Sequence, residues 1–211
     1  MKNLRHIATR WKGRWVDWID PHFGDFKKVY PLIDAIPGFL KSPQQERWFF
    51  NAARKAPENA VIVEIGSFLG RSTASFALAC KGTQKHIYAI DLFEGDNDMY
   101  GQGDFQRRFQ ENMARCGIAE HVTDMKSHSL EVAKGWTTPI DILFIDGSHE
   151  YDDVKADFHA FFPFVKKGGI IAFHDIKGKW DGVIRFWAEV QQSGLMIDFG
   201  AVSSLGFGIK K

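Results

Sequence analysis

Short apolar runs alternate with amphipathic stretches along most of the chain. The runs at 61–65, 86–90, 140–145 and 170–173 are typical of strands covered on both faces, and a weaker run spans 121–126. Several of the stretches between them repeat apolar residues with the 3.6-residue period of a helix. Strands and helices in alternation predict βαβ units, whose strands lie parallel and whose crossovers are right-handed.

Helices are predicted before the first strand and after most of the others. Ser42 and Pro43 make a favourable start, an N-cap with proline at the first helical position, for a helix that reaches about Lys55. Two final apolar runs, 195–199 and 205–209, are close enough for an antiparallel hairpin. The other expected helices are at 71–81, 105–116, 151–162 and 182–192, with a short one that follows Ser129 and reaches Lys134, and with a turn at 166–169 before the strand at 170–173.

These elements predict the fold class α/β. We expect a Rossmann-like, doubly wound sheet of seven strands, mostly parallel with an antiparallel C-terminal strand. With 211 residues the chain can bury a sizeable core without disulfides or a structural metal. We predict residues 41–211 as the ligand-binding domain and residues 1–40 as an aromatic-rich N-terminal helical extension.

The predicted extension is unusual in its tryptophans. Trp11, Trp15 and Trp18 are spaced i, i+4 and i+7, so on a helix they form one aromatic stripe. The stripe is either a lid or an oligomer contact, or an apolar face that packs on the domain's own core. Residues that interrupt helices recur through the segment and predict several short helices: Pro21, Gly24, Pro31, Pro37 and Gly38.

Composition narrows the classes of function. The net charge is +1 and charged residues make up 25% of the chain, so nothing predicts a surface for nucleic acid. No apolar stretch reaches the length of a membrane span and the N-terminus has no apolar signal segment, so neither membrane insertion nor secretion is expected. Cys80 and Cys116 match no CxxC spacing and are predicted to be reduced core thiols of a cytoplasmic protein.

The stretch Val61–Thr73 combines a buried strand, a glycine-bearing turn and a helix start. Gly66 and Gly70 supply the backbone freedom that close approach to a ligand requires. The amides of the following helix point back at the turn, where a carboxylate or a phosphate can bind. An ordinary βα connection with one turn glycine would give a similar pattern.

This turn does not match the dinucleotide fingerprint G-x-G-x-x-G. In either register the fingerprint meets side chains where two of its glycines belong, Ile65 and Ser67 or Phe68 and Arg71. A cofactor of the NAD type is therefore not predicted.

Polar residues stand at the ends of four predicted parallel strands: Glu64, Asp91, Asp146, and the pair His174 and Asp175. Ligands of open α/β sheets bind outside the carboxyl ends of the strands. These side chains, far apart in the sequence, are therefore expected to converge on one crevice. That convergence favours an enzyme over a scaffold protein.

Two groups of motifs resemble known methyltransferases. Glu64-x-Gly66-x-x-x-Gly70-x-Ser72 resembles motif I of class I S-adenosylmethionine-dependent methyltransferases. Downstream, the sequence is similar to the small-molecule O-methyltransferases of methyltransferase family 24. That group includes macrolide-sugar O-methyltransferases and cephalosporin-hydroxylase-like proteins, and it is related to catechol O-methyltransferase. The downstream resemblance rests on Asp146-Gly147-Ser148-His149-Glu150-Tyr151, Asp157, Gly168-Gly169 and His174-Asp175, and the whole covers about residues 36–211.

The resemblance implies S-adenosylmethionine as the cofactor and a methyltransferase domain at 41–211. Glu64, Gly66 and Ser72 would hold the methionine end, Asp91 the ribose hydroxyls, and Ser129 would lie near the adenine. The full implied cofactor set is Glu64, Gly66, Ser67, Phe68, Gly70, Ser72, Asp91, Leu92, Ser129 and Asp146.

The resemblance also implies a divalent metal, Mg²⁺ or Mn²⁺, held by Asp146, His174 and Asp175, with His149 as general base. Catechol-type enzymes carry Asp-Asn where this chain has His174 and Asp175, which leaves the ligand role of His174 open. An imidazole suits the base because it titrates near neutral pH. A capping or surface role for His149 is the plainer alternative.

The predicted function is S-adenosylmethionine-dependent O-methylation of a small hydroxylated molecule, a sugar or a natural product. If the N-terminal stripe is an oligomer contact, the enzyme forms a homo-oligomer. Two alternative functions stay open. Two histidines and a carboxylate can form the facial triad of a non-haem iron oxygenase. The chain can also be a non-catalytic cofactor-binding protein. The expected acceptor walls, residues 1–40 and 93–103, carry no readable code for the acceptor.

Overall fold

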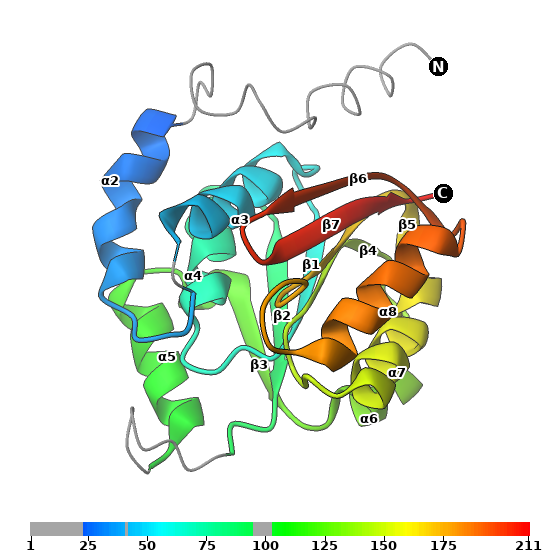
Figure 1. Ribbon diagram of the computed structural model, residues 1–211. Coiled ribbons are helices and arrows are strands. Elements are labelled where there is room, and N and C mark those ends of the chain that lie inside the picture. Colours follow the sequence, from blue (N-terminus) through cyan, green and yellow to red (C-terminus); the bar gives the residue numbers. More distant parts are fainter. Residues whose placement is uncertain (1–22, 41, 95–102) are drawn as a thin grey trace.

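The computed structural model describes residues 23–40, 42–94 and 103–211 and shows one seven-stranded sheet with helices on both faces (Figure 1). The strand order is β3-β2-β1-β4-β5-β7-β6, in which the first five are parallel, β7 runs antiparallel to β5, and β6 antiparallel to β7. The predicted fold class is confirmed. The strands are β1 Val61–Ile65, β2 His86–Asp91, β3 Val122–Lys126, β4 Ile140–Ile145, β5 Val165–Phe173, β6 Met196–Val202 and β7 Leu205–Lys210.

Both faces of the central strands are buried, as their apolar runs predicted. Successive residues of β4 point to opposite faces, so Leu143 and Phe144 enter different apolar clusters. Phe144 packs with Phe49 of α3 and Phe76 of α4, at ring-centroid distances of 4.7 and 6.2 Å. The helices are α2 Phe23–Asp34, α3 Pro43–Lys55, α4 Arg71–Ala77, α5 Phe105–Arg115, α6 Ser129–Lys134, α7 Tyr151–Phe161 and α8 Asp181–Gln192.

Helix α4 is shorter than the predicted helix at 71–81. It ends at Ala77, and the chain then forms tight turns in which the Ala79 amide bonds the Phe76 carbonyl and the Cys80 amide bonds the Ala77 carbonyl. These i→i+3 bonds replace the helical pattern and lead the chain into β2. Cys80 and Cys116 are both buried and free, which agrees with the prediction of core thiols.

The turn predicted at 166–169 lies inside β5 and is an irregularity of that strand. Ile140 pairs with Val165 but Ile142 pairs with Ile170, so the residues between them bulge out of register. Gly168 has a φ of 82°, which suits the bulge. The Lys166 ammonium holds the segment to β4 through both oxygens of Asp141, at 2.8 and 2.9 Å.

The predicted helix breaks at Gly24 and Pro31 are wrong, because α2 runs through both residues. An internal proline removes one amide donor and strains a helix, but the burial of Phe26 and Ile33 in the apolar core offsets that cost. The described part of the predicted extension thus packs on the main core. Its tryptophan stripe at Trp11, Trp15 and Trp18 lies outside the described residues.

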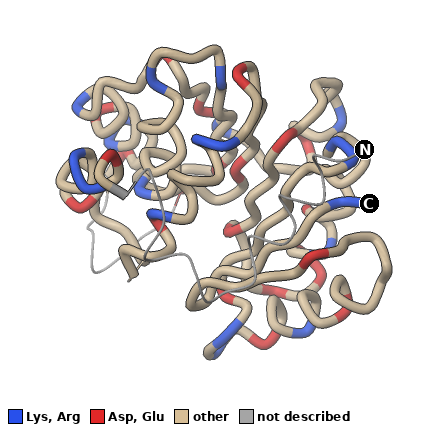
Figure 2. Tube along the Cα trace, turned by 90° about the horizontal axis from the view of Figure 1, so that it is seen from above, with Lys and Arg blue, Asp and Glu red and all other residues tan. Residues whose placement is uncertain are grey.

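Charged residues of both signs are interspersed along the described chain (Figure 2). This distribution agrees with a net charge of +1. In the described ranges, no helix is both long enough and apolar enough to span a bilayer.

Candidate active site

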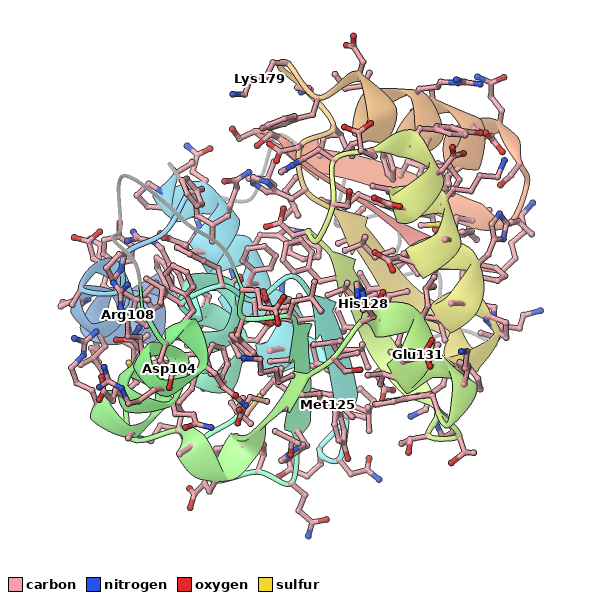
Figure 3. All side chains as sticks on the ribbon, turned by 90° about the horizontal axis from the view of Figure 1, so that it is seen from below. Asp104, Arg108, Met125, His128, Glu131 and Lys179 are labelled. Atoms are coloured by element: carbon pink, nitrogen blue, oxygen red, sulfur yellow. The ribbon has the colours of Figure 1, made fainter. Side chains whose placement is uncertain are left out.

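A cleft of about 1000 Å³ opens at the carboxyl ends of the parallel strands. Figure 3 labels two of its lining residues, His128 at the start of α6 and Lys179 in the segment before α8, which come from well-separated parts of the fold. Glu64 and Gly70 are buried and do not line the cleft. The predicted site residues that line the cleft are Gly66, Ser67, Phe68, Ser72, Asp91, Leu92, Ser129, Asp146, His149, His174 and Asp175.

The turn between β1 and α4 requires both of its glycines. Gly66 has a φ of 87°, and a Cβ at this position would overlap the carbonyl oxygen of Asp146. The two strand ends are also joined by a hydrogen bond of 2.8 Å from the Asp146 amide to the Ile65 carbonyl. Gly70 has a φ of 88°, and a Cβ there would lie 2.5 Å from Cε of Met113. The glycines therefore let the turn press against β4 and α5.

Glu64 supports this turn from below. Its side chain is fully buried, and its carboxylate accepts hydrogen bonds from the hydroxyls of Ser67, Ser72 and Thr73. Burial raises the pKa of Glu64 to about 7, although the hydroxyl hydrogen bonds oppose that rise. Glu64 thus orients two hydroxyls of the cleft wall and does not itself face the cleft.

Replacing Glu64 with glutamine is expected to flatten the dependence of stability on pH. The native carboxyl stays protonated up to about pH 7 whereas the unfolded one ionises near pH 4.5, so the folded state binds more protons between these values. Stability from this group is full below pH 4.5 and is lost as the pH rises through 7. The loss is on the order of 3 kcal/mol, and glutamine, which has no proton to lose, abolishes it.

Urea denaturation of the native chain and of Glu64→Gln at several pH values would measure this effect. The control is Glu58→Gln, an exposed residue in the loop between α3 and β1, which makes the same chemical change away from the core. Equal pH slopes for the native chain and the Glu64 variant would contradict the interpretation.

The carboxylate of Asp91 joins the end of β2 to the glycine turn. Its Oδ2 accepts hydrogen bonds from the amides of Ser67 and Phe68, at 2.7 and 2.8 Å, and its Oδ1 accepts one from the Phe93 amide at 2.6 Å. Phe68 and Phe93 have φ values of 48° and 50°, a strained conformation that these hydrogen bonds help to hold. The residue predicted to bind ribose therefore also fixes the shape of the turn.

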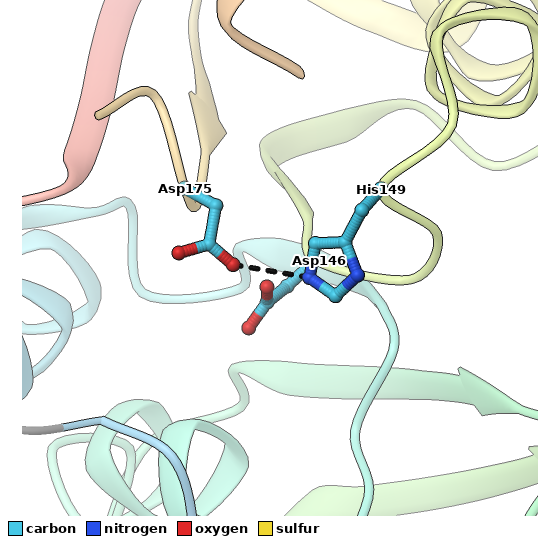
Figure 4. Close-up of side chains that lie close together, drawn as sticks. All are labelled: Asp146, His149 and Asp175. Atoms are coloured by element: carbon cyan, nitrogen blue, oxygen red, sulfur yellow. Dashed lines mark hydrogen bonds and ion pairs between the residues drawn. The ribbon is translucent and has the colours of Figure 1, made fainter. Parts of the chain in front are cut away.

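Three side chains from the ends of β4 and β5 converge on one point. Asp146, His149 and Asp175 offer ligand atoms that all lie within 4.8 Å of one another. Nε2 of His149 is 3.1 Å from Oδ2 of Asp175 (Figure 4). Asp175 has a φ of 57°, so the backbone is strained where it turns this carboxylate into the cleft.

His174 is buried and contacts both carboxylates of this group, those of Asp146 and Asp175. Its Nδ1 is 3.4 Å from Oδ1 of Asp146 and 3.2 Å from Oδ2 of Asp175, while its Nε2 is 3.2 Å from the Gln45 amide and 3.4 Å from the Ser204 hydroxyl. Both ring nitrogens thus have protein partners.

The pKa shifts of His174 and of the two carboxylates agree with these contacts. Burial would lower the pKa of His174, but the two carboxylates outweigh it and raise the pKa to about 10. Burial likewise opposes the charge of Asp175, yet hydrogen bonds from His149 and His174 hold the pKa of that carboxyl well below its usual range. Burial raises the pKa of Asp146. The histidine and the carboxylates therefore stabilise one another's charges.

The sequence prediction missed three residues that contact the two histidines of the site. Gln45 and Ser204 reach His174 from α3 and from the β6–β7 hairpin, and they also bond each other at 3.0 Å. Trp180 stacks on His149, with ring centroids 3.9 Å apart and an interplanar angle of 11°. No sequence spacing links these residues to the histidines, because the contacts are made only by the tertiary fold.

The sheet order, the glycine turn and a cleft at the strand ends define a Rossmann-like α/β protein whose cleft lies at the switch point of the sheet, where ligands of such sheets bind. The family model described as a methyltransferase domain, of methyltransferase family 24, matches residues 63–176, more than half of the chain. The chain belongs to this methyltransferase family, and the family predicted from its motifs is confirmed.

Comparisons with individual proteins agree with the fold. The chain is 28% identical over 192 residues to uncharacterized protein y4gI of Sinorhizobium fredii, an alignment that covers 88% of this chain. An O-methyltransferase from Bacillus cereus, solved in complex with S-adenosylhomocysteine, is 16% identical with a TM-score of 0.63 and coverage of 96% and 100% of the two chains. TomG from Streptomyces achromogenes, an O-methyltransferase solved with S-adenosylmethionine, is 16% identical with a TM-score of 0.62 and coverage of 100% and 99%.

The chain spans only part of the curated relatives it matches. The alignment covers 20% of the length of y4gI and 52% of the length of uncharacterized protein R132 of Acanthamoeba polyphaga mimivirus. The activity of such longer proteins therefore does not transfer directly to this chain.

Proposed function

We propose that the chain is an S-adenosylmethionine-dependent O-methyltransferase that acts on a small hydroxylated molecule, a sugar or a natural product. The observation that carries the proposal is that one cleft joins the glycine turn and Asp91 to the group of Asp146, His149 and Asp175. A methyl donor and an acceptor hydroxyl must meet in such a cleft for an in-line displacement.

The donor half of the cleft has the groups that S-adenosylmethionine requires. Ser72 lies at the start of α4, where the helix amides favour the carboxylate of the methionine end. Asp91 is an acceptor for the ribose hydroxyls, and Leu92 offers apolar surface beside it. Bound S-adenosylmethionine would supply the electrophilic methyl group. Glu64 would act indirectly, by orienting the hydroxyls of Ser67 and Ser72.

The acceptor half has the groups for removing a proton from a hydroxyl. Two carboxylates and one histidine suit Mg²⁺ or Mn²⁺, and a divalent cation would lower the pKa of the acceptor hydroxyl. We assign the carboxylates of Asp146 and Asp175 as metal ligands and His149 as the general base. We propose that His174 positions both carboxylates, in place of the ligand role that the resemblance implied, because both of its nitrogens have protein partners.

The oxygenase alternative has less support from this arrangement. A facial triad uses two histidines and one carboxylate, whereas the converging group has one histidine and two carboxylates. A non-catalytic binding protein would share the donor half of the cleft, so only activity measurements separate it from the proposed enzyme.

Calorimetry with S-adenosylhomocysteine and with NAD tests the donor site directly. We expect S-adenosylhomocysteine to bind with a dissociation constant of about micromolar order and NAD to give no measurable heat, because the turn lacks the dinucleotide glycines. NAD binding without S-adenosylhomocysteine binding would refute the proposal. Release of S-adenosylhomocysteine from S-adenosylmethionine in the presence of pooled sugars and phenols, with and without EDTA, would then identify an acceptor and any need for metal.

A further inference from the structure

Trp180 is a cleft residue to which the proposed methyl transfer gives no role. Its indole lies nearly parallel to the imidazole of His149, with ring centroids 3.9 Å apart and an interplanar angle of 11°. Stacking covers one face of the imidazole, whereas the two ring nitrogens form their hydrogen bonds in the ring plane. The contact therefore restrains the ring and leaves its nitrogens free to bond or to accept a proton.

The imidazole of His149 has few other restraints. Its side chain is 34% exposed, and in the part of the chain that the structure describes its one side-chain hydrogen bond is the contact of 3.1 Å between Nε2 and Oδ2 of Asp175. A partly exposed side chain held at one atom can turn about that contact, and fixing its rotamer has an entropic cost. A second contact, on the face of the ring, removes this freedom.

Helix α8 holds Trp180 in a fixed place relative to this histidine. The Trp180 carbonyl accepts a hydrogen bond of 3.1 Å from the Ile184 amide, in the first turn of α8. Two residues after Trp180, a Cβ on Gly182 would lie 2.4 Å from the His149 carbonyl oxygen and 2.5 Å from the Tyr151 amide nitrogen. The start of α8 thus presses against the backbone that carries His149, while Trp180 covers its ring.

The packing of α8 on α7 supports this arrangement. Phe186 of α8 is buried and contacts the rings of Tyr151 and Phe158 on α7, at ring-centroid distances of 5.9 and 5.5 Å. The Lys179 ammonium lies 4.5 Å from the centroid of the Trp180 indole, a cation–π contact. Contacts within the protein therefore preorganise the indole.

We propose that Trp180 is a positioning residue that acts through His149 and keeps its imidazole directed at the carboxylates of Asp146 and Asp175. The inference rests on the proposed function, in which His149 is the general base. A base must lie within hydrogen-bonding reach of the acceptor hydroxyl, so a ring that turns out of the cleft for part of the time removes protons less often. Trp180 itself contacts neither the donor nor the acceptor in this assignment.

NMR of the chain labelled with ¹³C in its histidine rings tests the stack without any acceptor. The His149 signal is the one that His149→Ala removes. We expect the indole to shift this signal upfield, Trp180→Phe to retain part of the shift, and Trp180→Leu to lose it. A His149 signal at the same position in the native chain and in Trp180→Leu would overturn the inference, because the two rings would not be stacked in solution.

Turnover with the acceptor from the pooled screen tests the positioning itself. We expect Trp180→Leu to lower kcat by about 10- to 100-fold and to leave S-adenosylhomocysteine affinity within about twofold, because only the base is displaced. Trp180→Phe keeps a flat ring and should retain most of the rate. His149→Ala already lacks the base, so adding Trp180→Leu should lower turnover no further. A loss that persists in full in that background would overturn the inference, because Trp180 would then act on something other than His149.

Tyr151→Leu is the matched control, because it removes an aromatic ring that packs on Phe186 in the same contact of α7 with α8. It should lower the free energy of unfolding and leave kcat nearly unchanged. An equal loss of kcat in both leucine variants, or unchanged kcat in Trp180→Leu, would overturn the inference and leave the proposed function intact. A native chain that does not bind S-adenosylhomocysteine, or that turns over no acceptor, would overturn the proposed function and this inference with it.

Discussion

Replacing Gly66 with alanine is expected to abolish measurable S-adenosylhomocysteine binding and to lower the free energy of unfolding by on the order of 3 kcal/mol. The residue has a φ of 87°, which a side chain tolerates poorly, and an added Cβ would overlap the Asp146 carbonyl. That carbonyl belongs to the end of β4, whose ladder with β1 prevents it from moving aside. The turn must therefore shift away from the cleft or the strand ends must separate.

Gly82→Ala separates the two causes of this effect. Gly82 also has a positive φ, 75°, but a Cβ at that position would meet nothing within 4 Å. It should cost only the backbone strain, about 1 kcal/mol, and leave S-adenosylhomocysteine binding unchanged. Urea denaturation and calorimetry of both variants make the comparison. If Gly66→Ala resembles Gly82→Ala in both the free energy of unfolding and S-adenosylhomocysteine binding, the close approach of the turn to β4 contributes to neither.

The strands of this fold could be predicted because the apolar residues of each strand indicate its burial without knowledge of distant partners. The run Ile140–Ile145 is apolar at every position except Asp141, and such a run is typical of a strand covered on both faces. The exceptions were decided by distant partners. Gly168 and Gly169 have the composition of a turn, but the Lys166–Asp141 ion pair holds their segment against β4. Pro31 has the composition of a helix break, but the packed core keeps α2 intact.

For the candidate site, the sequence predicted which residues lie together but not the role of each. Parallel strands end at one edge, so acids at strand ends such as Asp146 and Asp175 were expected to meet, and they do. The division of labour among them was not predictable, because it depends on which ring nitrogens of His174 and His149 are already occupied. Gln45 and Ser204 decide that question for His174, and they lie 129 and 30 residues away in the sequence.

His149→Ala is expected to reduce methyl transfer by about 10²- to 10⁴-fold, the usual contribution of a general base. Affinity for S-adenosylhomocysteine should stay within about twofold, since the donor half of the cleft does not involve this residue. Turnover would be followed as S-adenosylhomocysteine release with the acceptor that the pooled screen identifies. His159→Ala is the control, because His159 is an exposed histidine on α7 that does not line the cleft.

Mn²⁺ titration of the same variant separates the two roles that the geometry allows for His149. Its Nε2 lies 3.1 Å from Oδ2 of Asp175, and one of its ring nitrogens lies within 4.8 Å of an Asp146 oxygen, so the ring is near enough to act as base or as ligand. As a base it should leave Mn²⁺ affinity nearly unchanged while turnover falls. As a ligand it should lower Mn²⁺ affinity and turnover together, and added Mn²⁺ should restore part of the rate. Unchanged turnover in His149→Ala would exclude both roles, whereas a native chain that binds S-adenosylhomocysteine but gives no turnover with any acceptor would favour a non-catalytic cofactor-binding protein.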